Sequence, residues 1–198
     1  MKLYFTPRTR ATRARWLLEE LGVPYELVKV EPSKGDTSTP EYLALNPFGQ
    51  VPTLVDGDVT LFESSAICMH LADRFPEHHL APPVGSAERA AYYQWIAVAE
   101  DTVEPVVLDF FRHARLPEGQ QAEAPLSRQR LNAVLAVVDS RLDGREFLVG
   151  AHFTAADVVM ASILHLAHTL KLLEGHPRLV DYVTRHTQRP AVRRAVTP

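Results

Sequence analysis

The sequence has a single cysteine, Cys68, among its 198 residues. One cysteine excludes an internal disulfide and a metal site built from cysteines alone, and it is typical of a reducing compartment. No uninterrupted apolar run approaches the roughly 18 residues that a membrane-spanning helix needs. The apolar start from Met1 to Phe5 meets Pro7 and Arg8 too soon for a secretory signal peptide. These absences predict a cytoplasmic protein that does not enter a membrane.

An excess of charge of either sign is also missing. Lys and Arg number 21 against 24 Asp and Glu, so the formal net charge is −3, and this balance argues against nucleic-acid binding. With 46% hydrophobic residues, the chain is too apolar to be disordered. The stretch before Glu19, the first acid, is rich in arginine and threonine and resembles an organelle transit peptide. The same stretch also has the pattern of a folded strand and helix, which we favour.

The first 75 residues alternate between strand and helix patterns. The run Lys2–Phe5 predicts a buried strand, residues 11–21 have the apolar face of a helix with Arg13 off that face, and residues 25–30 alternate as a second strand. Strand, helix and strand in so short a stretch imply a right-handed crossover and a parallel pair. Asp56-Gly57 between two short apolar runs predicts an antiparallel hairpin, and Ser64 is expected to cap a further helix. The prediction is a βαβ–ββα unit with a mixed four-stranded sheet.

The second part of the chain has helical patterns throughout. Apolar spacing predicts a long helix that Pro105 kinks, a second helix over 131–142 and a central helix from 155 to about 173. Two shorter helices complete the chain. The predicted organisation is an α/β domain over 1–76, a linker over 77–86 and an all-α domain over 87–198.

Two local patterns in the helical part receive structural interpretations. Thr154 and Asp157 have the spacing of a capping box, in which each side chain bonds the other residue's backbone N–H at a helix start. His165 and His168 lie three residues apart on a helix, but no Asp or Glu nearby completes a ligand set. We therefore predict no metal site.

Four motifs, in this order, resemble the glutathione transferase family. They are the start Tyr4–Arg13, the segment Asn46–Leu54, the segment Glu63–Ile67 and the Thr154–Asp157 box. The resemblance covers essentially the whole chain. It implies a thioredoxin-like N-terminal domain, an all-α C-terminal domain and a homodimer. It also implies glutathione as co-substrate and a small electrophile as the second partner, without metal, nucleic acid or membrane.

The resemblance further implies how glutathione is bound. The peptide bond before Pro52 would be cis, and the main chain of Val51 would pair with the cysteinyl unit as an added strand. The helix start at Glu63 and Ser64 would receive the γ-glutamyl amino and carboxylate groups. Taken alone, these residues favour a trans turn proline and a plain helix cap with a solvated acid. The expected glutathione site is Thr9, Lys34 (for the glycyl carboxylate), Gln50, Val51, Pro52, Glu63 and Ser64.

The residue that activates the thiol is expected to be Thr9. Ser-type members of the family place a serine after the first strand, and Thr9 matches that position. Cys-type bacterial members place a cysteine one residue later, where this chain has Arg10, and Tyr4 lies inside the predicted strand. A threonine hydroxyl would act by donating a hydrogen bond to the sulfur anion. Capping the helix that follows is the alternative role for Thr9, and the two roles are compatible.

The second substrate is expected to enter between the first loop and the helical domain. The expected reaction is addition of the glutathione sulfur to a soft electrophilic carbon, or displacement of a leaving group from it. Core packing is the alternative fate of the aromatic residues there, and the arginines favour acidic or electron-rich substrates. Two other functions fit the same motifs: a glutathione-dependent disulfide reductase or peroxidase, and a non-catalytic glutathione-binding regulatory module. The expected pocket residues are Thr6, Pro7, Arg8, Arg10, Phe110, Phe111 and His113.

Overall fold

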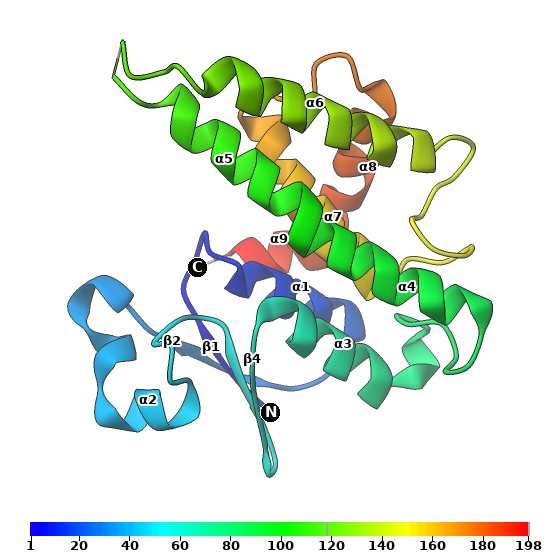
Figure 1. Ribbon diagram of the computed structural model, residues 1–198. Coiled ribbons are helices and arrows are strands. Elements are labelled where there is room, and N and C mark those ends of the chain that lie inside the picture. The colour runs from blue at the N-terminus through cyan, green and yellow to red at the C-terminus, as the bar shows by residue number, and fades with distance from the viewer. Residues whose placement is uncertain (118, 198) are drawn as a thin grey trace. The chain divides into compact units, whose positions relative to one another are not determined.

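A computed structural model describes residues 1–117 and 119–197 of the chain (Figure 1). The chain forms two compact units. The first comprises Met1–Ala81 together with the residues from Gln188 onward, and the second is Pro82–Thr187. The C-terminal segment thus groups with the α/β unit, although the sequence pattern assigns it to the helical domain. The domain limits predicted at residues 76 and 87 stay a prediction.

The first unit is built on the predicted mixed sheet. Its strand order is β2-β1-β3-β4, with β1 and β2 parallel and the other neighbours antiparallel. Leu3 and Leu54 lie opposite each other on the two central strands and are fully buried, as expected of strands in the middle of a sheet. The strands are β1 Lys2–Phe5, β2 Glu26–Lys29, β3 Thr53–Asp56 and β4 Val59–Phe62.

Two helices of the first unit, α1 and α3, lie side by side against the sheet (Figure 1). Helix α1 ends where Gly22 adopts a left-handed conformation (φ 64°) and its N–H donates to the Leu18 carbonyl at 3.0 Å, the usual way in which glycine ends a helix. The helical segments of this unit are α1 Ala11–Leu21, η1 Pro32–Lys34, η2 Asp36–Ser38, α2 Pro40–Leu45, α3 Ser64–Arg74, η3 Pro76–His78 and α9 Pro190–Val196.

Two details of this unit differ from the sequence prediction. Ser64 is the first residue of α3 rather than its cap, and Glu63 takes the cap position. Arg13 is predicted to lie off the apolar face of α1, but it is buried, and its Nη1 donates to the Ser64 hydroxyl at 3.3 Å. A hydrogen-bonded partner 51 residues away reduces the cost of burying the guanidinium. Helical spacing alone shows no such partner.

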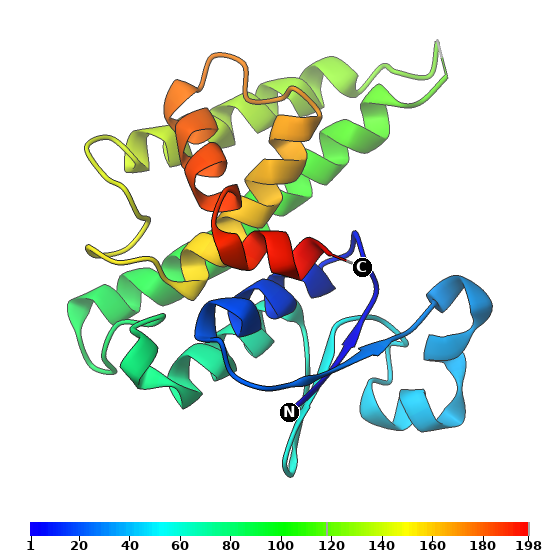
Figure 2. The same ribbon diagram turned by 180° about the vertical axis from the view of Figure 1, so that it is seen from behind.

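Helix α9 packs against α1, as the view in Figure 2 shows. Both oxygens of the Glu20 carboxylate accept from Arg189, at 2.6 and 2.8 Å, and Arg194 Nε donates to Glu19 at 2.6 Å. Arg15 Nη1 donates to the Thr197 carbonyl at 2.6 Å. These contacts attach the C-terminal segment to the helix that follows the first loop.

Among its described residues, the second unit contains helices and loops but no strand. The segment before Pro105, where the sequence predicts a kink, is a π-helical turn, η4, in which wider hydrogen bonding replaces the α-helical pattern. The central helix ends at Thr169 rather than near Leu173. None of the helices in the described chain is both long and apolar enough to cross a membrane. The elements are α4 Ala87–Ala97, η4 Val98–Val103, α5 Glu104–Ala114, α6 Ala124–Arg141, α7 Ala155–Thr169 and α8 Pro177–Thr187.

The predicted capping box is present at the start of α7. One Asp157 oxygen accepts from the N–H and the hydroxyl of Thr154, at 2.9 and 3.1 Å. The other accepts from the Leu148 N–H at 2.9 Å and the Tyr182 hydroxyl at 2.8 Å. Burial raises the pKa of Asp157, while these four hydrogen bonds oppose the shift. The box therefore also fastens α8 and the preceding loop to the central helix.

The contacts of Glu19 predict a pH-dependent contribution to stability. Burial alone would raise the pKa of Glu19, but hydrogen bonds from Tyr25 and Arg194 outweigh it and lower the pKa below its ordinary value. Because the folded-state pKa lies below that of the unfolded chain, ionised Glu19 stabilises the fold at neutral pH. The stabilisation is lost as the pH falls through the folded-state value. Glu19→Gln should therefore lower the free energy of unfolding at neutral pH, with a smaller loss in acid.

Urea denaturation of wild type and variant at several pH values measures this difference. Glu174→Gln, at an exposed position, serves as the matched control and should change little at any pH. A loss in Glu19→Gln that is the same at neutral and acidic pH would contradict the assigned pKa direction.

Candidate functional site

One row of strand pairing brings three separate loops to the same edge of the sheet. Thr53 pairs with Tyr4 of β1 on one side and with Phe62 of β4 on the other. Because both pairings are antiparallel, the chain leaves β1 and β4 at the edge where it enters β3. Residues 6–10, 50–52 and 63–64 are therefore neighbours, although they are far apart in the sequence.

A small hollow of about 30 Å³ lies at this edge. That volume admits a group the size of a carboxylate or a water molecule, so a larger ligand would lie across the open mouth. The hollow brings together five of the predicted site residues, Gln50, Val51, Pro52, Glu63 and Ser64, whereas Thr9 and Lys34 are not in its lining. The full lining is Arg10, Asn46, Phe48, Gln50, Val51, Pro52, Phe62, Glu63 and Ser64.

The turn before β3 is held from the inside of the unit. The Val51–Pro52 peptide bond is cis, as the family resemblance implies. The Gln50 carbonyl accepts from the Tyr42 hydroxyl at 2.6 Å and from Asn46 Nδ2 at 2.9 Å. Within the described chain, neither the N–H nor the C=O of Val51 forms a hydrogen bond. The outer main-chain groups of the turn can thus accept a ligand.

The start of α3 forms the other side of the hollow. Glu63 has φ 67° and ψ 120°, a backbone conformation that is sparsely populated by residues other than glycine. The first N–H groups of a helix have no partner inside the helix and attract negative charge. The buried Arg13 guanidinium, bonded to the Ser64 hydroxyl, adds a positive charge that the sequence analysis missed. The arrangement suits a carboxylate.

Thr9 and Lys34 have other partners in the structure. The Thr9 hydroxyl donates to the Thr6 carbonyl at 2.8 Å and accepts from the N–H of Ala11, the first residue of α1, at 3.2 Å, although the cap position of α1 is Arg10 rather than Thr9. The single hydroxyl proton of Thr9 must break its hydrogen bond to the Thr6 carbonyl before Thr9 can donate it to a ligand. The Lys34 side chain is 70% exposed and its Nζ lies 2.8 Å from Glu31 Oε2. A hydrogen bond from this ammonium to Glu31 raises the pKa of Lys34.

The residues predicted for the second substrate divide between the two units. In the first unit, Pro7, Arg8 and Arg10 are exposed, and Arg10 lines the hollow. In the second unit, three half-buried side chains of α5 have charged neighbours: Phe110 lies under Arg128, Phe111 under Arg115, and His113 Nδ1 is 3.6 Å from Asp109. A joint pocket of both groups stays a prediction.

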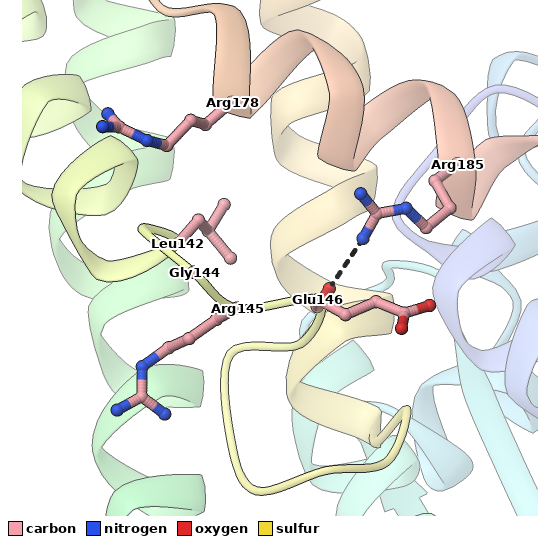
Figure 3. A pocket seen from close by; sticks show the side chains of 6 residues that line it. All are labelled: Leu142, Gly144, Arg145, Glu146, Arg178 and Arg185. Carbon is pink, nitrogen blue, oxygen red and sulfur yellow. Dashed lines mark hydrogen bonds between the residues drawn. The ribbon is translucent and has the colours of Figure 1, made fainter.

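A wider hollow of about 520 Å³ lies on the second unit, lined by Leu142, Gly144, Arg145, Glu146, Arg178 and Arg185 (Figure 3). Arg178 is ion-paired with Asp139 and Asp143, at 2.5 and 3.1 Å. Arg185 donates to the Glu146 carbonyl at 3.3 Å, and Figure 3 shows Arg145 pointing away from Arg178. The arginines do not converge on one point, so the smaller hollow is the better candidate despite its size.

No group of three or more metal-ligating side chains occurs among residues 1–117 and 119–197. His165 lies beside His168, and its pKa is lowered first by burial and then by that neighbour.

Comparisons with known proteins match both units. Residues 1–73 match the family model of the glutathione S-transferase N-terminal domain, and residues 94–185 match that of the C-terminal domain. Glutathione S-transferase GstA of Escherichia coli O157:H7 is 31% identical over 100% of this chain and 98% of its own. A glutathione transferase structure from Methylococcus capsulatus has a TM-score of 0.84 and 30% identity, covering 98% of this chain and 96% of its own. A sphingomonad glutathione S-transferase complexed with glutathione has a TM-score of 0.84 and 28% identity, covering 99% and 97%.

The close approach at Gly49 predicts how sensitive the turn is to substitution. Gly49 has φ 60°, and a Cβ there would lie 3.0 Å from the Thr37 carbonyl oxygen. Gly57 has φ 61° with nothing within 4 Å of such a Cβ, so Gly57→Ala is a matched control for the left-handed backbone alone. We expect Gly49→Ala to lower the free energy of unfolding by about 1 kcal/mol more than Gly57→Ala. Urea denaturation measures both, and equal losses would contradict a tight approach at Gly49.

Proposed function

The chain belongs to the glutathione S-transferase family and is a glutathione transferase; from this premise we propose that it binds glutathione across the hollow of the first unit. The glutathione thiolate would then attack a small, hydrophobic electrophile and form a conjugate with it. The observation on which the proposal rests is that Val51, Pro52, Glu63 and Ser64 line one hollow. A related sphingomonad protein in complex with glutathione supports the choice of ligand.

The γ-glutamyl end would bind at the start of α3. Its carboxylate would accept from the Ser64 hydroxyl and from N–H groups of the first helical turn, where the helix dipole favours an anion. Arg13 donates to the Ser64 oxygen, and its guanidinium adds attraction for the carboxylate. The Glu63 carboxylate would receive the ligand's amino group.

The cysteinyl unit would pair with the main chain of Val51. An extended peptide that adds to a sheet edge gains main-chain hydrogen bonds and keeps alternate side chains free. The N–H and C=O of Val51 have no partner among the described residues, as such pairing requires. The thiol would then lie near the loop 6–10.

Thr9 is the proposed donor to the thiolate. A free thiol has a pKa of about 8.5 and is only about 3% ionised at pH 7. Lowering that pKa by about two units requires about 2.7 kcal/mol. One charge-assisted hydrogen bond of about 1.5–3 kcal/mol and a helix N-terminus of about 0.3–1 kcal/mol suffice together.

This activation alone gives a small gain in rate. The anion fraction would rise about 25-fold, while intrinsic nucleophilicity falls about 6- to 10-fold at a Brønsted slope near 0.4–0.5. Most of the catalysis must then come from holding the electrophile against the sulfur. The residues proposed to contact the electrophile are Thr6, Pro7, Arg8, Arg10, Phe110, Phe111 and His113.

The other readings of the motifs are not favoured. The relatives that match the whole chain are named as transferases, which favours conjugation over disulfide reduction or a purely regulatory role. A homodimer is typical of the family and is our proposal for the assembly. We also propose a cytoplasmic location, because a chain with a single, buried cysteine, Cys68, suits a reducing compartment.

Replacing Ser64 tests the carboxylate site. We expect Ser64→Ala to raise the Kd for S-methylglutathione at least about tenfold, because a charge-assisted hydrogen bond contributes about 1.5–3 kcal/mol. Titration calorimetry gives the Kd, and S-methylglutathione avoids any effect on the thiol. The exposed Ser33→Ala should bind as wild type does. Equal affinity of Ser64→Ala and wild type would contradict the proposed site.

Replacing Thr9 tests thiol activation separately from binding. The ultraviolet absorbance of the bound thiolate, followed against pH, gives the thiol pKa in each complex. We expect Thr9→Ala to raise that pKa by about one unit or more, since the lost hydrogen bond stabilises the anion. Thr9→Ser keeps the hydroxyl and should restore the wild-type value. A Thr9→Ala variant with an unchanged thiol pKa would show that Thr9 is not the donor.

A further inference from the structure

Beneath the turn at residues 50–52 lies a buried chain of hydrogen bonds. Besides its bond to the Gln50 carbonyl, the Tyr42 hydroxyl lies 2.9 Å from Thr53 Oγ1, and Asn46 Nδ2 lies 3.2 Å from the same oxygen. Tyr42, Asn46 and Thr53 are 4%, 2% and 0% exposed. Water therefore has little access to these groups, and each bond depends on the protein alone.

The direction of each bond follows from counting protons. A carbonyl oxygen can only accept, so Tyr42 uses its single proton on Gln50. The Tyr42 oxygen must then accept from the Thr53 hydroxyl, and Thr53 in turn accepts from Asn46. The two Asn46 amide protons go to Thr53 and Gln50, while Asn46 Oδ1 accepts from the Phe48 N–H at 3.1 Å. The chain runs in one direction and ends at the Gln50 carbonyl.

The Gln50 carbonyl controls the ligand-facing side of the turn. The C=O of residue 50 and the N–H of residue 51 belong to one planar peptide group and point in opposite directions when the bond is trans. The cis peptide bond of this turn is Val51–Pro52, and the preceding Gln50–Val51 bond is trans. Two buried donors pull the carbonyl inward, and the Val51 N–H is therefore directed outward.

We propose that Tyr42 is a positioning residue for glutathione: its hydroxyl fixes the Gln50 carbonyl and so orients the Val51 N–H that pairs with the cysteinyl unit. This inference rests on the proposed function. Tyr42 does not touch the ligand and acts through the peptide plane. Burial, as the largest cause, raises the pKa of Tyr42, which keeps the hydroxyl proton available at neutral pH and above.

Tyr42→Phe removes the hydroxyl and keeps the ring. Tyr4→Phe is the matched control, because the Tyr4 ring packs edge-to-face on Tyr42 with 5.4 Å between centroids, and its hydroxyl is outside the chain of bonds. We expect Tyr42→Phe to raise the Kd for S-methylglutathione about 2- to 10-fold, the effect of one lost hydrogen bond. The KM for glutathione should rise in parallel, kcat should stay within about twofold, and Tyr4→Phe should match wild type.

Thr53→Val provides a second variant, since it removes the donor to Tyr42 and should raise the Kd in the same direction. Wild-type protein that fails to bind S-methylglutathione would refute the proposed function itself. With wild-type binding intact, an unchanged Kd in Tyr42→Phe, even with a lower melting temperature, would overturn the positioning role. An equal rise in Tyr42→Phe and Tyr4→Phe would also overturn it, because the effect would then come from ring packing.

Discussion

The pairing of Thr53 with Tyr4 and Phe62 is the constraint on which the candidate site depends. This row sets where the chain leaves β1, enters β3 and leaves β4, and so it places the loops of the site beside one another. A slip of one residue in β3 would turn the Thr53 side chain to the opposite face of the sheet. The hydrogen bonds of Thr53 to Tyr42 and Asn46 would then be lost, together with the support of the turn.

Much of the fold could be predicted because its signals are local. The hairpin depends on Asp56-Gly57 between two short strands, and the central helix depends on a capping box of four residues. Both are contained in a few consecutive residues, and the structure confirms them. The grouping of α9 with the first unit has no such signal. It arises from Glu19 and Glu20 on α1, which bind arginines about 170 residues later in the chain.

The site was predictable where main-chain geometry is coupled to a short motif. The resemblance of the segment Asn46–Leu54 to the glutathione transferase family implies the cis bond at Pro52, and the structure contains it. Side-chain partners were not predictable in the same way. Nothing near Arg13 in the sequence indicates that its guanidinium reaches Ser64, and nothing near Thr9 indicates that its hydroxyl proton is already donated to Thr6. Both hydrogen bonds depend on how close the folded chain brings these residues to one another. Neither the periodicity nor the spacing of residues in the sequence indicates that distance.

A binding surface made of main-chain groups limits how affinity can be adjusted. The N–H and C=O of Val51 are the same for almost every residue type, so substitution at that position changes packing more than hydrogen bonding. Their direction, by contrast, is set by the peptide plane and hence by whatever holds the preceding carbonyl. In this protein the holding groups are the buried side chains of Tyr42 and Asn46, which bind the Gln50 carbonyl from inside the unit. Under the proposed function, the part of the affinity that comes from pairing with Val51 would therefore depend on side chains in the layer behind the turn.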